Sequence, residues 1–133
     1  MIKLVCPLSI TLGINKKKTY YLNLNNYRNW HYQISNTLKE EFKERMRSQL
    51  QNITPIPIDR GIFITYILYS GSKRRRDLRN ITTVIDKFLC DALVAYGIIP
   101  DDNCNICNGF MDLYGGIDKD NPRVEVYINE ITN

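Results

Sequence analysis

The sequence of 133 residues predicts an α/β domain, in which two main helices pack on a mixed sheet (α+β in detail). Two observations support this fold class. Segments with strand or helix periodicity follow one another in the order strand, short strand, helix, strand, helix, strand, strand. Hydrophobic residues make up 44% of the chain and charged residues 24%, which is ordinary for a globular protein. Neither a repeat nor a low-complexity tract divides residues 1–133, so we expect one domain.

The N-terminal half supplies an expected strand, a basic turn and a long helix. Residues 2–12 are rich in Val, Ile, Leu and Thr, which favour a strand. Three lysines at residues 16–18 precede a short extended segment, residues 19–24, with two tyrosines. This arrangement suits a surface that touches phosphates and bases, or equally a solvated loop followed by core tyrosines. From Asn25 or Asn26 to Leu50, apolar residues recur every four positions and predict an amphipathic helix.

The second half contains the expected central strand and the second helix. Residues 51–57 hold two prolines and read as a linker. Residues 58–70 are apolar on both sides of the strand, which predicts a central strand covered on both faces. Apolar residues at helical spacing follow Asn80 and predict a helix that ends at Gly97. Residues 106–114 and 123–131 are expected to form the last two strands.

Charged residues gather where the central strand leads into the second helix. The cations at residues 73–76 run directly into Asp77, and Asp86-Lys87 follows on the polar side of the helix. A further pair, Asp101-Asp102, comes in the next loop. Cations beside several carboxylates are typical of a phosphate backbone held next to a divalent metal ion. The pattern therefore predicts a nuclease.

The order of these pieces resembles the RusA family of Holliday-junction resolvases, many of which phages or prophages encode. The resemblance covers about a third of the chain closely and the rest only in element order. One position departs from the family pattern, because Arg79 stands where better-known members carry a second catalytic aspartate. We expect Asp86 to supply that carboxylate. The matching residues are Arg76-Asp77-Leu78-Arg79-Asn80, Asp86-Lys87, Asp91-Ala92-Leu93, Gly97 and Asp101-Asp102.

The resemblance implies a Mg²⁺-dependent endodeoxyribonuclease, with Mn²⁺ as an alternative ion, that resolves Holliday junctions or other branched DNA in recombination and repair. It also implies a homodimer that makes paired nicks. The implied catalytic residues are Asp77, Asp86, Lys87 and Asp102, and the implied metal ligands are Asp77, Asp86, Asp101 and Asp102. The residues expected to bind DNA are Lys16, Lys17, Lys18, Lys73, Arg74, Arg75, Arg76 and Arg79.

Other interpretations stay open. Arg79 at an expected acid position favours a non-catalytic protein that binds branched DNA and assists recombination. The pair Cys104-x-x-Cys107 would suit a zinc-stabilised nucleic-acid binder if Cys6 and Cys90 converged on it, although incidental reduced thiols are the simpler interpretation. Each acid also has a structural alternative: a local ion pair for Asp77, a solvated pair for Asp86 with Lys87, and turn chemistry for Asp101-Asp102.

The compartment is predicted from what the sequence lacks. No apolar run approaches the ~20 residues of a membrane span, and the first residues do not resemble a signal peptide. We therefore expect a cytoplasmic protein with no membrane partner. Its net charge of +4 is modest, so the clustering of the cations says more about a nucleic-acid partner than the total does.

Overall fold

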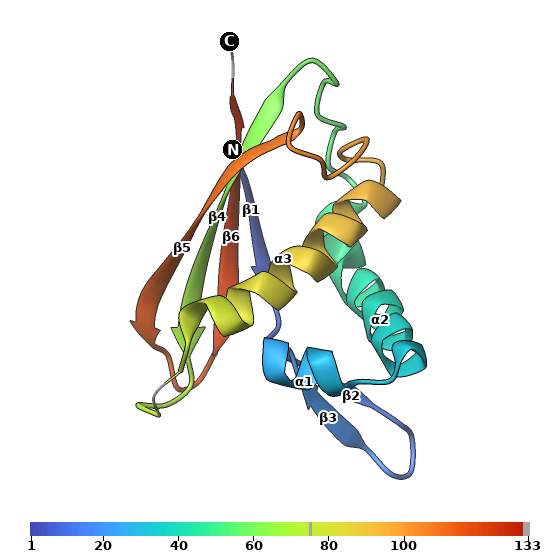
Figure 1. The fold of residues 1–133 in the computed structure, drawn as a ribbon, viewed down its shortest axis with the longest axis vertical. Coiled ribbons are helices and arrows are strands. Elements are labelled where there is room, and N and C mark those ends of the chain that lie inside the picture. Colours follow the sequence, from blue (N-terminus) through green and yellow to red (C-terminus); the bar gives the residue numbers. More distant parts are fainter. Residues whose placement is uncertain (75, 132–133) are drawn as a thin grey trace.

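The computed structural model describes residues 1–74 and 76–131, and Figure 1 shows their arrangement. The protein has an α+β fold in which helices pack on a four-stranded mixed sheet with the order β1-β6-β4-β5. β4 pairs in parallel with β5 and antiparallel with β6, which also pairs antiparallel with β1. The strands are β1 (Ile2–Cys6), β4 (Gly61–Ser70), β5 (Cys107–Ile117) and β6 (Arg123–Ile131).

The N-terminal segment forms two strands rather than the one that residues 2–12 predict. β1 ends before Pro7, and β2 (Ser9–Leu12) leaves the main sheet to pair with β3 (Lys18–Tyr21) in a separate hairpin. Proline has no N–H to donate to a strand ladder, so it stands at the point where the chain changes sheets. The hairpin carries Lys16 and Lys17 in its loop, at the lower end of the molecule in Figure 1.

The expected first helix is interrupted. α1 (Leu24–Asn29) ends at Trp30, and α2 (Tyr32–Leu50) begins after His31, whose extended backbone breaks the helical course. The Nδ1 atom of His31 accepts a hydrogen bond from the N–H of Gln33 at 3.3 Å, so this histidine caps α2. A cap was not foreseen for His31, because histidine is not among the residues that usually cap helices.

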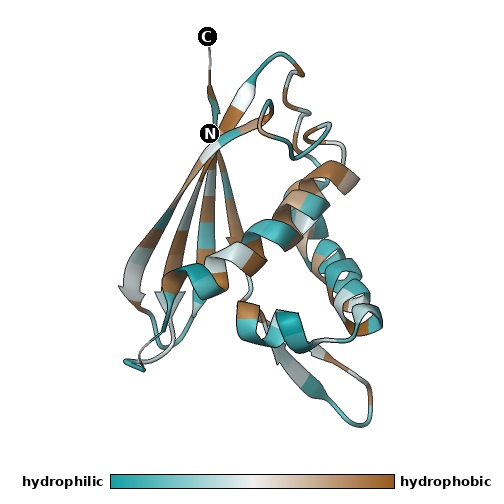
Figure 2. Ribbon diagram, viewed as in Figure 1, coloured by the Kyte–Doolittle hydropathy of each residue, from teal (hydrophilic) through white to brown (hydrophobic). Residues whose placement is uncertain are grey.

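The second of the two helices predicted from the sequence is α3 (Leu78–Ala95), which lies between the sheet and α2 (Figure 1). Its apolar side is buried, and brown and teal residues alternate along α3 in Figure 2. Phe88 of α3 meets Phe42 of α2 edge to face, with ring centroids 5.6 Å apart. The predicted apolar spacing of both helices is therefore confirmed where it meets the core.

None of the helices in the described residues is long and apolar enough to cross a membrane.

The sheet is covered by helices on one face only, so the prediction that β4 is covered on both faces is wrong. Its central position between β5 and β6 is confirmed. Side chains of β4 alternate between full burial, as at Tyr66, and partial burial, as at Tyr69. On the second face, which no helix covers, a side chain from β6 lies over part of β4. The Arg123 guanidinium lies 4.2 Å from the centroid of the Tyr69 ring.

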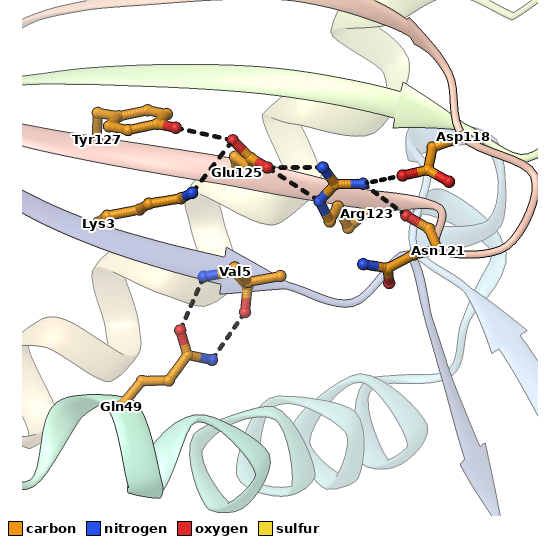
Figure 3. Close-up of polar contacts among 8 residues, drawn as sticks. All are labelled: Lys3, Val5, Gln49, Asp118, Asn121, Arg123, Glu125 and Tyr127. Carbon is orange, nitrogen blue, oxygen red and sulfur yellow. Dashed lines mark hydrogen bonds and ion pairs between the residues drawn. The ribbon is translucent and has the colours of Figure 1, made fainter.

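A polar cluster on this second face links β6 to β1 and to the β5–β6 turn (Figure 3). Glu125 accepts hydrogen bonds from Arg123 and from the Tyr127 hydroxyl, and Lys3 lies 3.8 Å away. Arg123 also donates to Asp118 at 2.8 Å. The cluster thus holds the turn that lies beside the end of β4.

The outer edge of β1 is covered by a side chain from α2 (Figure 3). The amide of Gln49 accepts from the N–H of Val5 at 2.8 Å and donates to its carbonyl at 2.9 Å, as a neighbouring strand would. An exposed strand edge is prone to pairing with other chains, and this amide blocks one position of that edge.

Candidate functional site

Asp77 stands at the N-terminus of α3, where the loop from β4 ends. Its Oδ1 atom accepts a hydrogen bond from the backbone N–H of Arg79 at 3.2 Å, so Asp77 is the N-cap of the helix. Aspartate is favoured at this position because its oxygen pairs with an unsatisfied N–H and its charge opposes the helix dipole. The side chain remains exposed to solvent. Asp77 therefore has a structural role that is compatible with a chemical one.

A cleft of about 620 Å³, which we call the polar groove, opens beside Asp77. One wall comes from the loop and the start of α3, and the other from the segment that joins β3 to α1. The groove brings Arg74 and Arg76 together with Asp77, as the sequence predicts. The residues that line it are Tyr21, Asn23, Asn25, Asn26, Arg74, Arg76, Asp77, Asn80 and Ile81.

The asparagines of the polar groove were not predicted as site residues. Asn23 caps α1, and its Oδ1 atom accepts from the N–H of Asn26 at 2.9 Å. The cluster Asn23, Asn25, Asn26 in the sequence is the signal that could have been used, because amides commonly contact phosphates and sugars. Of the two tyrosines before these asparagines, one is packed in the protein and the other is exposed at the groove. Tyr20 packs edge to face on Trp30, whereas Tyr21 is 60% exposed and lines the groove.

Asp86 lies in the middle of α3 and faces the sheet. Its Oδ1 atom accepts hydrogen bonds from the hydroxyl of Tyr66 and, at 3.4 Å, from the thiol of Cys90. Burial, followed by the charge of Asp86, raises the pKa of Tyr66, so this phenol stays a donor. Asp86 is thus joined to the core rather than to Lys87, its predicted solvated partner.

A second acid that the sequence analysis did not select, Asp112, shares a small hollow of about 100 Å³ with Asp86. Asp112 comes from β5, and its Oδ2 atom lies 3.7 Å from the Nε atom of Arg79. Its side chain is only 12% exposed. The sequence signal that could have identified Asp112 is an acid that alternates with Phe110 and Tyr114 on one side of the predicted strand. Arg79, predicted to bind DNA, keeps a 76% exposed side chain beside this half-buried acid.

Asp101 and Asp102 lie beyond the other end of α3. The helix has 18 residues and is therefore about 27 Å long. The N–H of Ile98 bonds to the carbonyl of Leu93 and closes the C-terminus of the helix, so the chain does not return towards Asp77 before Asp102. The Asp101 carboxyl has a lowered pKa because the Asp102 N–H and the Asn103 amide donate to it.

The expected convergence of Asp77, Asp86 and Asp102 on one metal ion does not occur within a single chain. These residues occupy the start, the middle and the far side of α3. In residues 1–74 and 76–131, no three His, Cys, Asp or Glu side chains are grouped so that they could hold a metal ion. The four predicted ligands therefore do not fit one magnesium site in this arrangement. Their assignment stays a prediction that the geometry of one chain does not favour.

The other predicted site residues lie at separate places. Lys87 is exposed, and its Nζ atom lies 6.0 Å from the ring centroid of Tyr27 in α1. Lys18 lies over the Tyr20 ring at 5.0 Å in the hairpin. Lys73 lies near Arg74 and Arg76 in the lining of a second pocket, on the β5 side of the loop. Arg75 falls outside the described residues.

The cysteines do not assemble into the four-thiol site that the zinc alternative requires. Burial raises the pKa of Cys6 to about 12, and Cys104 is exposed in the loop before β5. Cys90 of α3 lies beside Cys107, and its single S–H is donated to Asp86. All four thiols are free.

No family model matches the chain, and no curated protein is significantly similar to it. Fold and site together define an α+β protein with a cationic, amide-lined groove at the N-terminus of α3.

Proposed function

We propose that this chain binds branched DNA in the polar groove and acts on it as a structure-specific endodeoxyribonuclease, as the RusA resemblance implies. The observation that carries the proposal is the composition of the groove, where two arginines, several amides and Asp77 surround the start of an 18-residue helix. Arginine and amide side chains together with helix N-termini are the usual partners of DNA phosphates.

The distribution of charge supports a nucleic-acid partner at this end of the molecule. The hairpin with Lys16 and Lys17, α1 and the loop after β4 all lie at the lower end in Figure 1. The cations of α2 are engaged differently, since Arg45 and Arg47 pair with Glu41 and Glu44 at 3.2 and 2.8 Å. The cations at this end would therefore attract a phosphate backbone towards the polar groove.

Asp77 is the carboxylate best placed for chemistry at a phosphate held in the groove. It lines the groove together with Arg74 and Arg76, whereas Asp86, Asp101 and Asp102 do not. Dependence on Mg²⁺ and the formation of a homodimer with two sites remain parts of the proposal that rest on the resemblance. Because the predicted ligands do not form one site, we derive no catalytic step from the metal.

The second candidate function is a non-catalytic protein that binds branched DNA. It is favoured by Arg79, because the residue at the expected acid position is an arginine, which lies 3.7 Å from another acid, Asp112. Both functions share the polar groove and differ only in cleavage.

Salt-dependent binding tests the groove. We compare the wild type with R74A/R76A on a labelled four-way junction, using R45A/R47A as a control with the same change of charge on α2. Each lost phosphate contact makes the negative slope of log K against log salt shallower by about 0.9. The slope of R74A/R76A is therefore expected to be shallower than that of the wild type by about 1.8. The control is expected to keep the wild-type slope. Equal slopes for the two double variants would refute the polar groove as the DNA-binding site.

Cleavage of the same junction separates the two candidates. The wild type and Asp77→Asn are incubated with the junction or a matched linear duplex, in Mg²⁺, Mn²⁺ or EDTA. Paired nicks on the junction alone that need the metal ion and Asp77 would establish the nuclease. Tight junction binding with no nicks under any of these conditions would instead establish the binding protein.

A further inference from the structure

The loop between β4 and α3 borders a second pocket on the side away from the polar groove. This pocket, which we call the β5 pocket, has a volume of about 390 Å³. Its lining consists of two leucines, one tyrosine, one serine and three cations of the loop. They are Leu68, Leu78, Tyr114, Ser70, Lys73, Arg74 and Arg76.

Tyr114 is held with its ring open to the pocket. Its hydroxyl shares a hydrogen bond of 2.7 Å with the Oγ atom of Ser70, at the end of β4. The residue nevertheless remains 55% exposed, so a large part of the ring has no protein neighbour. Leu68, which is almost fully buried, and the half-buried Leu78 add apolar side chains to the lining. A hydroxyl anchored in this way orients the aromatic face and leaves it available for stacking.

The chemistry of the β5 pocket selects its ligand. A free phosphate would use the cations but not the tyrosine and leucines, and a purely apolar ligand would gain nothing from three cations at the rim. A nucleotide uses both, because its planar base stacks on an aromatic ring and its phosphate pairs with Arg or Lys. The volume of about 390 Å³ lies in the range of small-molecule pockets.

We propose that the β5 pocket accepts one unpaired nucleobase of a DNA branch, stacked on Tyr114, with the adjoining phosphate against Lys73, Arg74 and Arg76. The inference rests on the proposed function and names the structural feature that the protein recognises. Arg74 and Arg76 line both the polar groove and the β5 pocket, so a strand that leaves the groove across the loop meets the pocket next.

A second exposed aromatic residue continues this surface. Phe110 is 59% exposed and lies on the same side of β5 as Tyr114, four residues earlier in the strand. Four residues of strand span about 13 Å, which leaves room for a stacked base at each ring. β5 thus presents two stacking surfaces along one edge, beside the cations of the loop.

Junctions with and without an unpaired nucleotide test this inference. Two four-way junctions are compared, one fully paired and one with a single unpaired 2-aminopurine at the branch point. Base–aromatic stacking energies predict that the wild type binds the second junction about tenfold more tightly and quenches its fluorescence. Tyr114→Leu, which removes the ring but keeps an apolar side chain, is expected to abolish both effects.

Two further variants complete the experiment. Tyr114→Phe keeps the aromatic face and is expected to restore the preference, whereas Tyr32→Leu removes a 67% exposed tyrosine outside the pocket and serves as the control. Thermal melting checks that each variant folds. If the wild type binds both junctions equally without quenching, the inference is overturned while the groove stands. If it binds neither junction, the proposed function fails and the inference falls with it.

Discussion

Replacing Glu125 by glutamine is expected to destabilise the fold by an amount that depends on pH. Glu125 lies in the polar cluster of Figure 3, with its side chain only 10% exposed. It accepts hydrogen bonds of 3.0 and 2.7 Å from Arg123 and one of 2.8 Å from Tyr127. A glutamine would keep one acceptor oxygen but turn an NH₂ group towards a donor. The cluster matters for the site because Asp118, which pairs with Arg123, also bonds through its N–H to the carbonyl of Ser70.

The expected loss at pH 7 is about 2 kcal/mol. Hydrogen bonds to a charged group contribute about 1.5–3 kcal/mol, and Arg123 keeps Asp118 as a partner after the change. For a domain of this size the loss corresponds to a fall in Tm of about 8 °C. Glu130→Gln is the matched control, since Glu130 is also on β6 and pairs with Arg60 at 2.6 Å but is 38% exposed. An exposed pair of this kind contributes up to about 1 kcal/mol.

The sign of the pH dependence follows from the pKa of Glu125. Hydrogen bonds from Tyr127 and then Arg123 lower this pKa below the ordinary value of 4.5. The stabilisation is therefore complete above pH 4.5 and is lost as the pH falls through the folded-state pKa. Chemical denaturation of the wild type and both variants between pH 7 and pH 3 measures the difference. A Glu125→Gln variant that is as stable as the wild type at pH 7, or a difference that does not shrink as the pH falls below 4.5, would refute the reasoning.

Three further predictions concern the site and its supports. Asp77→Asn should keep the thermal stability, because asparagine caps helices as well as aspartate does, whereas Asp77→Ala should lose about 1 kcal/mol in thermal denaturation. Gly115→Ala should destabilise the fold by about 1–3 kcal/mol in urea denaturation, because the new Cβ atom would lie 2.6 Å from the ring of Tyr69. Tyr66→Phe should cost about 1–3 kcal/mol in the same assay, because it removes a donor from Asp86 in a half-buried position. Unchanged stability of the last two variants would contradict the contacts described for them.

The sequence by itself determined the elements with a strong period. The apolar stripe from Leu38 to Leu50 and the spacing of Ile85, Phe88 and Leu89 indicate helices whatever lies next to them, and both are buried as expected. The alternation in β4 likewise indicates a strand, whereas the start of the second helix was predicted three residues too late, at Asn80 instead of the N-cap Asp77. These are local properties, since each depends on residues within a few turns or pleats of one another.

Only the tertiary structure decided which charged residues meet. The 18 residues of α3 lie between Asp77 and Asp102, so the length of the helix separates them, although both belong to the same sequence motif. The parallel pairing of β5 with β4 brings Asp112 opposite Tyr66, next to Asp86 and Arg79. It also carries Tyr114 to the end of β4 beside Ser70. Strand order and register depend on contacts between segments distant in the chain, which periodicity does not record. The site is therefore a property of the packed sheet and helix rather than of the motif.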